Sequence, residues 1–396
     1  MEMAERTFQM LLSLLLFGMA NSLVCAVDLP VSTGVFEQEV HRGYTTAQGL
    51  PDNNIQHLFC GADNSVVAFA ANGTARFDGK AWQIQDGPAH EESPQKMLST
   101  EQRKRLKNFF GGALDIRDVA AHQGEVAAAA DAGLFLDDGN SWRMVLPQQD
   151  KMRWAPVDVR AVVYDNEGRL WFAASQGVGC RISEDEWRLF TGNEGLPYND
   201  FTCMAAGSKV IWFGTTNGAI RYHNGHWSFR QGRRWLLDNY VKDIAVDGDG
   251  NAWIATSSGV SCIAGQGMTL AEKAAFYESE IEKYHRRTRF GYVAPVHLTT
   301  PGDKSSGTPV FTDNDGHYTG LYLGAVSLGY AATGKDKMRQ DAVNAFHALA
   351  FLSEVTQGGT HPAPKGFIAR CVLPTTEPDP NPQFDLAYDQ RRNQAD

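Results

Sequence analysis

Polar side chains recur at matched positions in five short segments between residues 54 and 242, each expected to form the innermost strand of a repeated unit. The first matched position holds Asn54, Asp115, Asp158, Asp200 and Tyr240. Two residues further along, three of the segments carry a cation: Arg117, Arg160 and Lys242. Side chains two residues apart share one face of a strand, so we expect two polar levels in a common channel. Such convergent groups can hold a polar ligand, for example an oligosaccharide or a hydrated cation; the alternative is that they only solvate the channel.

A second group of reactive side chains lies near the C-terminus, directly before an expected helix. It comprises Asp313, Asp315 and His317, to which the expected fold adds His285 and Arg370. Carboxylates can act as general acid and base on a glycosidic bond, and His or Arg side chains suit proton abstraction beside a uronate. The alternative, which we favour, is that both aspartates cap the helix and complement its dipole, because one helical hairpin cannot enclose a sugar.

Other chemistries lack the residues that they need. The aspartate-rich turns at Asp247 and Asp313 have Ser258 and Gly324 at the twelfth position, where a calcium loop needs a bidentate glutamate. No histidine pair has helical zinc spacing, and no glycine-rich phosphate loop or nucleophile motif occurs. The formal net charge of −10 opposes nucleic acid as the main partner. We therefore expect no metal, no cofactor and no nucleic acid.

The elements that position the first group come from a repeated module. Its turn glycines are 60, 44, 41 and 41 residues apart, at Gly73, Gly133, Gly177, Gly218 and Gly259. Each module shows three strand patterns separated by turn residues, and a tryptophan marks a fourth strand in the first four modules, at Trp82, Trp142, Trp187 and Trp227. A repeat of this length with several short strands is typical of propeller blades. The chain is therefore predicted to be mainly β.

The fifth module lacks a tryptophan strand, and the N-terminus supplies a candidate to replace it. Residues 44–51 resemble the segment 189–197, which follows the Trp187 strand, so residues 35–44 are expected to pair with the last blade. A strand lent in this way closes the ring and removes open sheet edges. We predict a closed five-bladed β-propeller over residues 35–265, with an insertion at 90–112 that forms a surface helix or lid.

The module resembles the two-component-regulator type of propeller repeat, which is found in extracytoplasmic sensor regions of bacterial signalling proteins. The fourth copy carries the resemblance most fully, through Gly195-Leu196-Pro197, Ile211-Trp212-Phe213-Gly214-Thr215, Arg221-Tyr222 and Gly225 with Trp227. The other copies match it in part. The resemblance implies a sensor-like propeller outside the cytoplasm.

From Thr269 the pattern becomes helical. Thr269 and Glu272 form a capping box, and the apolar spacing predicts two further helices that meet at Gly334. Residues 312–322, with Arg339 and residues 366–370, resemble the start of the six-hairpin α/α-toroid of glycoside hydrolases and polysaccharide lyases. We expect an α-helical hairpin segment at 269–372 that corresponds to the start of this toroid. A polar, proline-rich tail at 374–396 is expected to be disordered.

The first 26 residues resemble a secretory signal peptide, with an apolar stretch at 10–19 and small residues before Val27. No later segment is apolar enough to anchor the chain in a membrane, so we expect export to the periplasm or beyond. The leading hypothesis is non-catalytic recognition of a polar small molecule or oligosaccharide through the channel face, with a protein partner on a propeller face as a further option. The alternative is a polysaccharide-processing enzyme, a glycoside hydrolase or polysaccharide lyase, with an incomplete toroid. Whether any reaction is catalysed stays open.

Overall fold

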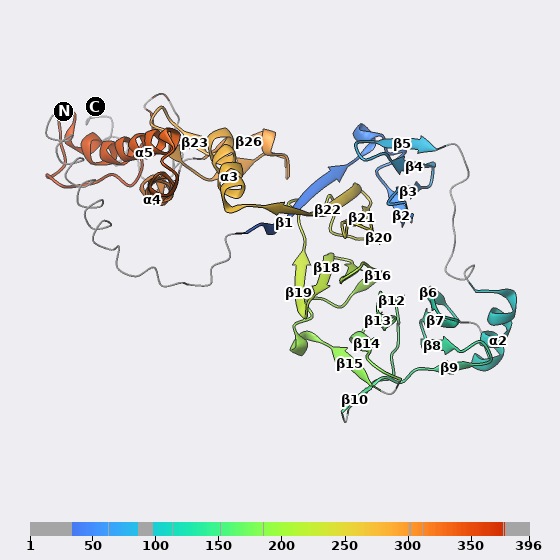
Figure 1. The fold of residues 1–396 in the computed structure, drawn as a ribbon. Helices are drawn as coiled ribbons and strands as arrows, with labels where there is room; N and C mark the ends of the chain where they lie inside the picture. Colours follow the sequence, from blue (N-terminus) through green and yellow to red (C-terminus); the bar gives the residue numbers. More distant parts are fainter. Residues whose placement is uncertain are drawn as a thin grey trace, which may run out of the picture.

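The computed structural model describes residues 34–374 and 376, with gaps at 62, 86–97, 113, 151, 185, 301 and 311. The expected signal peptide at 1–26 and nearly all of the expected tail at 374–396 lie outside the described residues. Within these limits the chain is mainly β up to Met268 and mainly helical after it (Figure 1). No helix of the described part has the length and apolar character that crossing a membrane requires.

Five four-stranded antiparallel sheets make up most of the β part, as the module predicts, and a short hairpin of β10 (Gln148–Gln149) and β11 (Met152–Arg153) lies between the second and third. The first sheet contains β2 (Ile55–Cys60), β3 (Val66–Ala70), β4 (Gly73–Phe77) and β5 (Trp82–Gln85). The second contains β6 (Ile116–His122), β7 (Glu125–Ala130), β8 (Gly133–Asp137) and β9 (Trp142–Met144). The third contains β12 (Ala161–Tyr164), β13 (Leu170–Ala174), β14 (Gly177–Arg181) and β15 (Trp187–Phe190). The fourth contains β16 (Phe201–Ala206), β17 (Val210–Thr215), β18 (Gly218–His223) and β19 (His226–Arg230).

The fifth sheet contains β20 (Asp243–Val246), β21 (Ala252–Thr256), β22 (Gly259–Met268) and the N-terminal strand β1 (Phe36–Tyr44). Strand β1 pairs with β22 along its whole length, from Phe36 opposite Met268 to Tyr44 opposite Val260. Glu39 on β1 also accepts ion pairs of 2.5 Å from Arg221 and Arg230 of the fourth sheet. The predicted use of the N-terminal strand as the outer strand of the last sheet is therefore confirmed.

A hydrogen bond between the aspartate of the first hairpin turn and a nearby tryptophan explains why both residues recur in the module. In the third sheet, Asp165 accepts hydrogen bonds from the backbone of Arg169 and, at 2.8 Å, from the indole Nε1 of Trp171. In the fifth sheet, Asp247 does the same for Trp253 at 2.9 Å. Each aspartate thus satisfies a buried indole that would otherwise lose its hydrogen bond, and it fixes the hairpin between the first two strands of its sheet.

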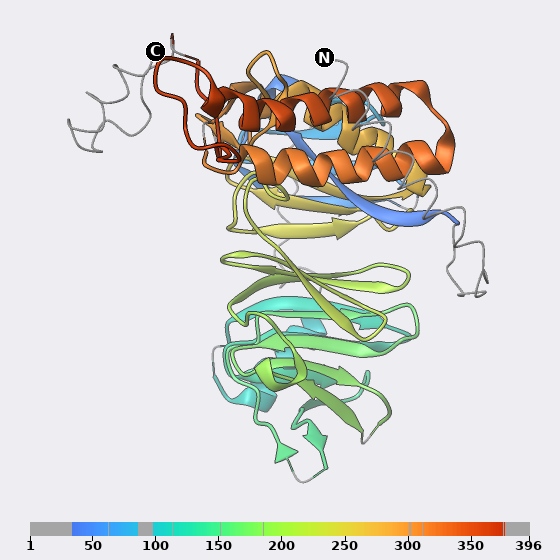
Figure 2. The same ribbon diagram turned by 90° about the vertical axis from the view of Figure 1, so that its left-hand side faces the viewer.

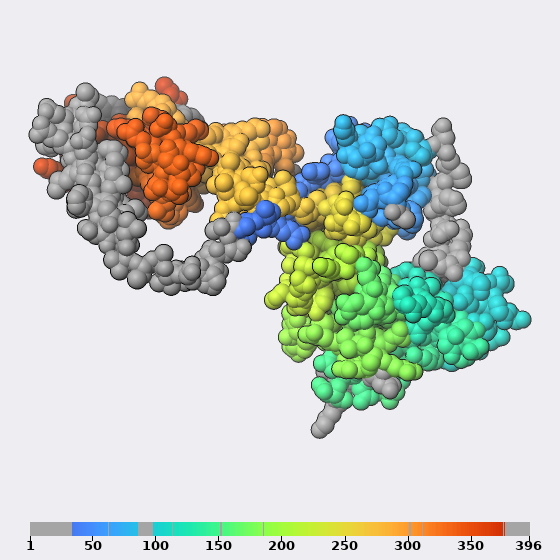
Figure 3. All heavy atoms as spheres, viewed as in Figure 1, coloured from blue at the N-terminus to red at the C-terminus, as the bar shows by residue number. Residues whose placement is uncertain are grey.

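Successive sheets pack in the order second, third, fourth, fifth, first, and their innermost strands β6, β12, β16, β20 and β2 lie around a common centre (Figure 1). The order does not return from the first sheet to the second. In Figure 3 the blue first sheet rests on the yellow fifth sheet, away from the teal second sheet. The ring that we predicted to be closed is thus open at this one step.

Helix α2 (Thr100–Phe110) gives the physical reason for the opening. It covers the face of the second sheet that would meet the first sheet in a closed ring. Leu98 and Leu106 are buried there against alanines of β7 and against Phe135 and Trp142. The Trp142 indole also donates to the Gln102 carbonyl at 3.1 Å. The helix of the insertion is thus exposed over most of its residues, as a surface helix is, while its inner side covers the face that a neighbouring sheet would occupy.

The C-terminal part begins with α3 (Leu270–Tyr284) and ends with an antiparallel pair, α4 (Asp315–Thr333) and α5 (Asp336–Glu354), which Figure 2 shows side by side. Thr269 and Glu272 form the predicted capping box of α3, and Gly334 ends α4 with a backbone φ of 67°. Two short hairpins, β23 (Arg286–Arg287) with β24 (Tyr292–Val293) and β25 (Val296–Leu298) with β26 (Gly307–Pro309), connect α3 to α4. We did not predict these two hairpins from the sequence.

Candidate functional site

The first candidate site is an ionic network at the start of the innermost strands of the second and third sheets. Arg117 contacts Asp115 at 3.3 Å and also pairs with Asp158, which precedes β12. Arg160 holds the other carboxylate oxygen of Asp158 at 2.8 Å. Burial acts to raise the pKa of Asp158, but the hydrogen bonds from Arg117 and Arg160 outweigh it and the pKa is lowered. Four of the eight predicted ligand-binding residues are therefore joined in one chain of alternating charge.

Asp158 also has an unusual backbone. Its φ of 53° lies in the left-handed region, which a residue with a Cβ adopts at a cost of roughly 1–2 kcal/mol. Its amide donates to the Asp131 carbonyl of the second sheet at 2.8 Å. Strained backbone of this kind is concentrated at functional sites, and here it turns the Asp158 carboxylate toward two arginines.

A second polar contact between neighbouring sheets, from a cation to neutral amides, joins the fifth sheet to the first. Lys242 donates to Asn54 and, at 3.5 Å, to Gln56. Two predicted residues remain outside both groups. Asp200 accepts a hydrogen bond of 2.8 Å from Thr216 of its own sheet, and the Tyr240 side chain is half exposed. The structure thus brings together six of the eight residues, in two groups, and leaves these two separate.

Two aspartates that we did not predict, Asp118 and Asp243, come one residue after Arg117 and Lys242 on their strands. Asp118 accepts hydrogen bonds of 2.9 Å from the amides of Val119 and of Val162 on the third sheet. Asp243 likewise accepts from Ile244 and from Leu58 on the first sheet, both at 2.9 Å. Each one ties its strand to the innermost strand of the next sheet. The sequence contains a signal for them, because Arg117-Asp118 and Lys242-Asp243 are cation–aspartate pairs at the same module position.

Few positive charges lie near these two aspartates to offset their negative charge. Burial raises the pKa of Asp118 to about 7, although its two backbone hydrogen bonds act against the rise, and the charge of Asp243 adds to it. Burial also raises the pKa of the Cys203 thiol well above its usual value. The His57 ring stands 3.6 Å from Asp243. The innermost strands therefore carry an ionic network at their starts and, further along, the Asp118 carboxyl and the Cys203 thiol, whose pKa values burial raises.

The second candidate site does not assemble as a catalytic pair. Asp315 has no exposed surface, since it pairs with Arg287 and accepts the Val372 amide at 3.2 Å. Asp313 pairs with Arg370 at 3.0 Å on the surface. Burial raises the pKa of Asp315, and Arg287 offsets part of the rise. Asp315 is thus an anchor between the start of α4 and the chain before and after it.

The capping that we favoured for these aspartates is also not what the structure shows. Asn314 is the N-cap of α4 and makes no side-chain cap bond. The two neighbouring aspartates, Asp313 and Asp315, pair with Arg370 and Arg287 instead. Asp315 does lie in the first turn, where its charge suits the helix dipole. Of the remaining candidates, His285 hydrogen bonds to the Ala294 carbonyl at 2.9 Å, and His317 is exposed beside Tyr318.

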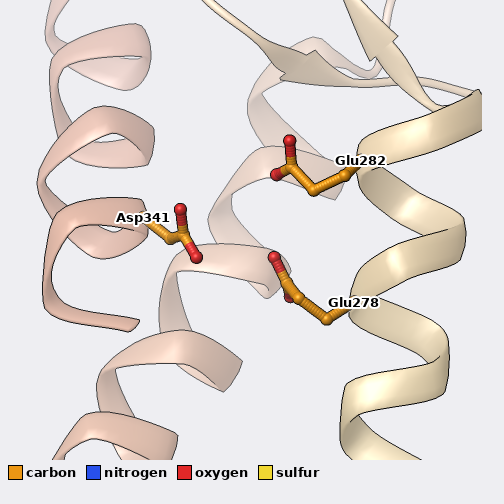
Figure 4. Close-up of side chains that lie close together, drawn as sticks. All are labelled: Glu278, Glu282 and Asp341. Atoms are coloured by element: carbon orange, nitrogen blue, oxygen red, sulfur yellow. The ribbon is translucent and has the colours of Figure 1, made fainter. Parts of the chain in front are cut away.

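Three carboxylates gather between α3 and α5 within 4.8 Å of one another: Glu278, Glu282 and Asp341 (Figure 4). Each already has a partner. Tyr322 donates to Glu278 at 2.5 Å, Arg286 to Glu282 at 3.0 Å, and Lys337 to Asp341 at 2.9 Å. Two cations thus offset most of the charge, and the cluster is a packing network between the helices.

Comparison with known proteins supports the repeat. The family model described as "Two component regulator propeller" matches residues 236–258, which end in the fifth module. No curated protein matches the chain. Among solved structures, the extracellular domain of the putative hybrid two component system BT3049 from B. thetaiotaomicron is similar at 17% identity, 59% coverage of this chain and 37% of that chain, with a TM-score of 0.35.

Two other solved structures are similar over a comparable share of this chain. A structural genomics protein of unknown function from Bacteroides thetaiotaomicron aligns at 12% identity, over 58% of this chain and 77% of that chain, with a TM-score of 0.39. The extracellular domain of the putative hybrid two component system BT4673 aligns at 11% identity, over 57% and 40%, with a TM-score of 0.35. This chain therefore spans less than two thirds of both two-component domains. The repeat resemblance is confirmed; the toroid resemblance stays a prediction.

Proposed function

We propose that this chain, which carries two-component-regulator propeller repeats, recognises a polar ligand at the channel mouth of its β part. The observation that carries the proposal is the network of Asp115, Arg117, Asp158 and Arg160, which spans two sheets. An oligosaccharide suits this site best, because planar ionic side chains can hydrogen bond to neighbouring hydroxyl groups in pairs. The half-exposed ring of Tyr240 offers a surface for a sugar face.

The exposure of the network's side chains favours ligand binding over a purely structural role. The side chains of Asp158 and Arg160 are 36% and 40% exposed, so their charges remain available to a ligand. The deeper Asp118 and Asp243, which are bound to backbone amides, already join the sheets. The outer network is therefore not needed for that purpose.

We also propose the finer architecture and location that the sequence suggested. The five sheets are the blades of one propeller over residues 35–265, with an insertion at 90–112 and a helical segment at 269–372. The protein acts outside the cytoplasm, in the periplasm or secreted. The enzyme alternative receives less support, because Asp315 is buried against Arg287 and Asp313 is paired with Arg370.

The test is a calorimetric screen of neutral and acidic oligosaccharides against the full chain and four variants. Asp158→Ala and Arg160→Ala should each weaken binding about tenfold or more, since each removes a charge-assisted contact. Asp200→Ala, at the same level, should also weaken it. Lys107→Ala, on the exposed side of α2, should leave it unchanged. Unaltered affinity in Asp158→Ala with an intact fold would exclude the channel mouth, and the absence of binding by every oligosaccharide would exclude the carbohydrate.

A further inference from the structure

Two hollows of matching construction open between neighbouring sheets, away from the channel. One lies between the third and fourth sheets with a volume of about 500 Å³, and the other between the fifth and first sheets with about 460 Å³. We call them the 3/4 hollow and the 5/1 hollow. Both volumes fall in the range of small-molecule sites. In Figure 1 the paired sheets of each hollow are neighbours.

The floors of the two hollows are built from equivalent residues. The 3/4 hollow has three aromatic rings, Trp171, Phe190 and Tyr222, and the 5/1 hollow has Trp253, Tyr44 and Phe77. Both contain a buried cysteine three residues after the turn glycine, Cys180 or Cys262. In both, an arginine comes two residues before the aromatic residue of the outer strand, Arg188 or Arg42. The repeat accounts for the shared floor. Differences between the two rims therefore indicate what each hollow could bind.

The rim of the 3/4 hollow carries an excess of positive charge. Arg169 there contacts both local acids, Asp165 at 2.8 Å and Glu167 at 3.0 Å, and offsets one of their two charges. Arg188 on β15 and Lys209, directly before β17, then face the hollow from its two opposite sheets. Within the described residues neither has an ion pair with a carboxylate, and both are exposed. The hollow therefore offers two cations that have no described carboxylate partner, of which Arg188 lies over the Phe190 ring of the floor at 5.1 Å from the ring centroid.

The rim of the 5/1 hollow has the opposite charge. Four aspartates line it, Asp63, Asp78, Asp247 and Asp249, against only Arg42 and Arg76. Arg76 is paired with Asp63 at 2.5 Å. Ser65, directly before β3, stands where Lys209 stands in the other hollow. The two hollows thus differ mainly in the charge that they present to a ligand, and the 5/1 hollow serves as an internal control.

We propose that the 3/4 hollow is a second binding site, for a hydroxylated ring that bears one carboxylate, as in a uronic acid. Arg188 and Lys209 bind the carboxylate, and a guanidinium can do so in a bidentate way. Asn166, Ser208 and Asn224 at the rim supply hydrogen-bonding groups for hydroxyls. The aromatic floor accepts the apolar face of the ring. The small net positive charge fits a monoanion better than a phosphate dianion.

The ligand can be a free acid or one residue of an acidic polysaccharide, and the experiment separates these sources. The full chain is titrated by calorimetry or NMR with D-glucuronate, with D-glucose as the neutral match, and with a short oligomer of uronic acid. A single sugar acid should bind with a Kd on the order of 1 mM, more weakly at high salt, and glucose should not. Tighter binding of the oligomer would indicate the polymer, and equal binding per site the free acid.

Matched variants locate the site. Arg188→Ala and Lys209→Ala should each weaken glucuronate binding about tenfold, and both residues are exposed, so the fold should survive. Arg42→Ala, the equivalent arginine of the 5/1 hollow, should leave binding unchanged. Asp158→Ala should also leave it unchanged, which separates this site from the channel mouth. Glucuronate binding that is unaffected by Arg188→Ala, that is matched by glucose, or that never saturates would overturn the proposal.

Discussion

The ion pair between α2 and the second sheet gives a sharp test of the position of that helix. Arg105 on α2 lies 2.6 Å from Asp137 on β8, and the side chains are 27% and 0% exposed, respectively. Replacement of Arg105 by alanine leaves a buried carboxylate with one further described hydrogen bond, from the Gly139 amide at 3.2 Å. Removal of one partner of a buried pair costs about 3–5 kcal/mol. Since Arg105 is partly exposed, we expect the low end, about 3 kcal/mol.

Urea denaturation of the wild type, Arg105→Ala and Lys107→Ala measures the effect. Lys107 carries the same charge on the same helix but is exposed, so its replacement should change the free energy of unfolding by less than about 0.5 kcal/mol. The double variant Arg105→Ala/Asp137→Asn removes the stranded charge and should be more stable than Arg105→Ala alone. Amide exchange in α2 should be faster in Arg105→Ala, because the helix loses its ionic attachment.

Two results would contradict this reasoning. If Arg105→Ala destabilises the protein no more than Lys107→Ala does, Arg105 does not compensate a buried charge. If the double variant is less stable than Arg105→Ala alone, the cost arises from lost packing and not from the carboxylate. The first result would remove the ionic support for α2 over the second sheet, whereas the second would keep the helix there and assign its attachment to packing.

Two further predictions concern the strands. The raised pKa of Asp118 means that the folded state holds its proton more tightly than the unfolded chain does. The contribution of Asp118 to stability should therefore fall as the pH rises from about 4 to about 7, by at most about 4 kcal/mol; unfolding measured across this range should show the fall in the wild type but not in Asp118→Asn, and parallel curves would refute it. In Gly177→Ala the new Cβ would lie 2.2 Å from the Phe190 carbonyl at a φ of 145°, whereas at Gly139, with a φ of 92°, the space is open. Gly177→Ala should therefore cost at least about 2 kcal/mol more than Gly139→Ala, and similar melting temperatures for the two variants would refute it.

The sheets could be predicted because the interactions that form them join residues close together in the sequence. Turn glycines, aspartates that satisfy a nearby indole, and apolar residues three apart all act within one module. The N-terminal strand was also within reach, since residues 44–51 repeat a segment that follows another outer strand. The wrong expectation was the closed ring, because the position of α2 depends on contacts between segments far apart in the sequence.

The sequence contains a signal for α2, which is the small volume of the buried side chains that face the helix. Phe172 in the third sheet lies five residues before its turn glycine, and Ala128 occupies the same position in the second sheet. Phe172 packs toward the second sheet, whereas Ala128 packs under Leu98 and Leu106. The run of alanines at 127–130 therefore leaves room that a helix can fill. Periodicity does not reveal this, because an alanine keeps the pattern of a buried strand while it removes the bulk.

The candidate site was predictable only in part for a related reason. The module fixes which residues share a level of the channel, but not which of them touch. Arg117 reaches Asp158 on the next sheet, while Asp200 at the same level binds Thr216 of its own sheet. A guanidinium is available for both aspartates, since Arg160 of the third sheet precedes Asp200 as Arg117 of the second sheet precedes Asp158. Arg160 instead pairs with Asp158 of its own sheet at 2.8 Å, and the module pattern does not decide between these two partners.

The repeat therefore separates architecture from recognition. Positions that every module needs, such as the turn glycine, are set by backbone geometry and carry little information about a ligand. Positions that differ between equivalent modules are free of that constraint. Lys209 against Ser65 changes the charge of a hollow whose floor is otherwise the same, and Arg117 against Thr202 changes the reach of a channel residue. Since neither difference is required by the packing of the sheets, these are the positions at which a ligand can have shaped the chain.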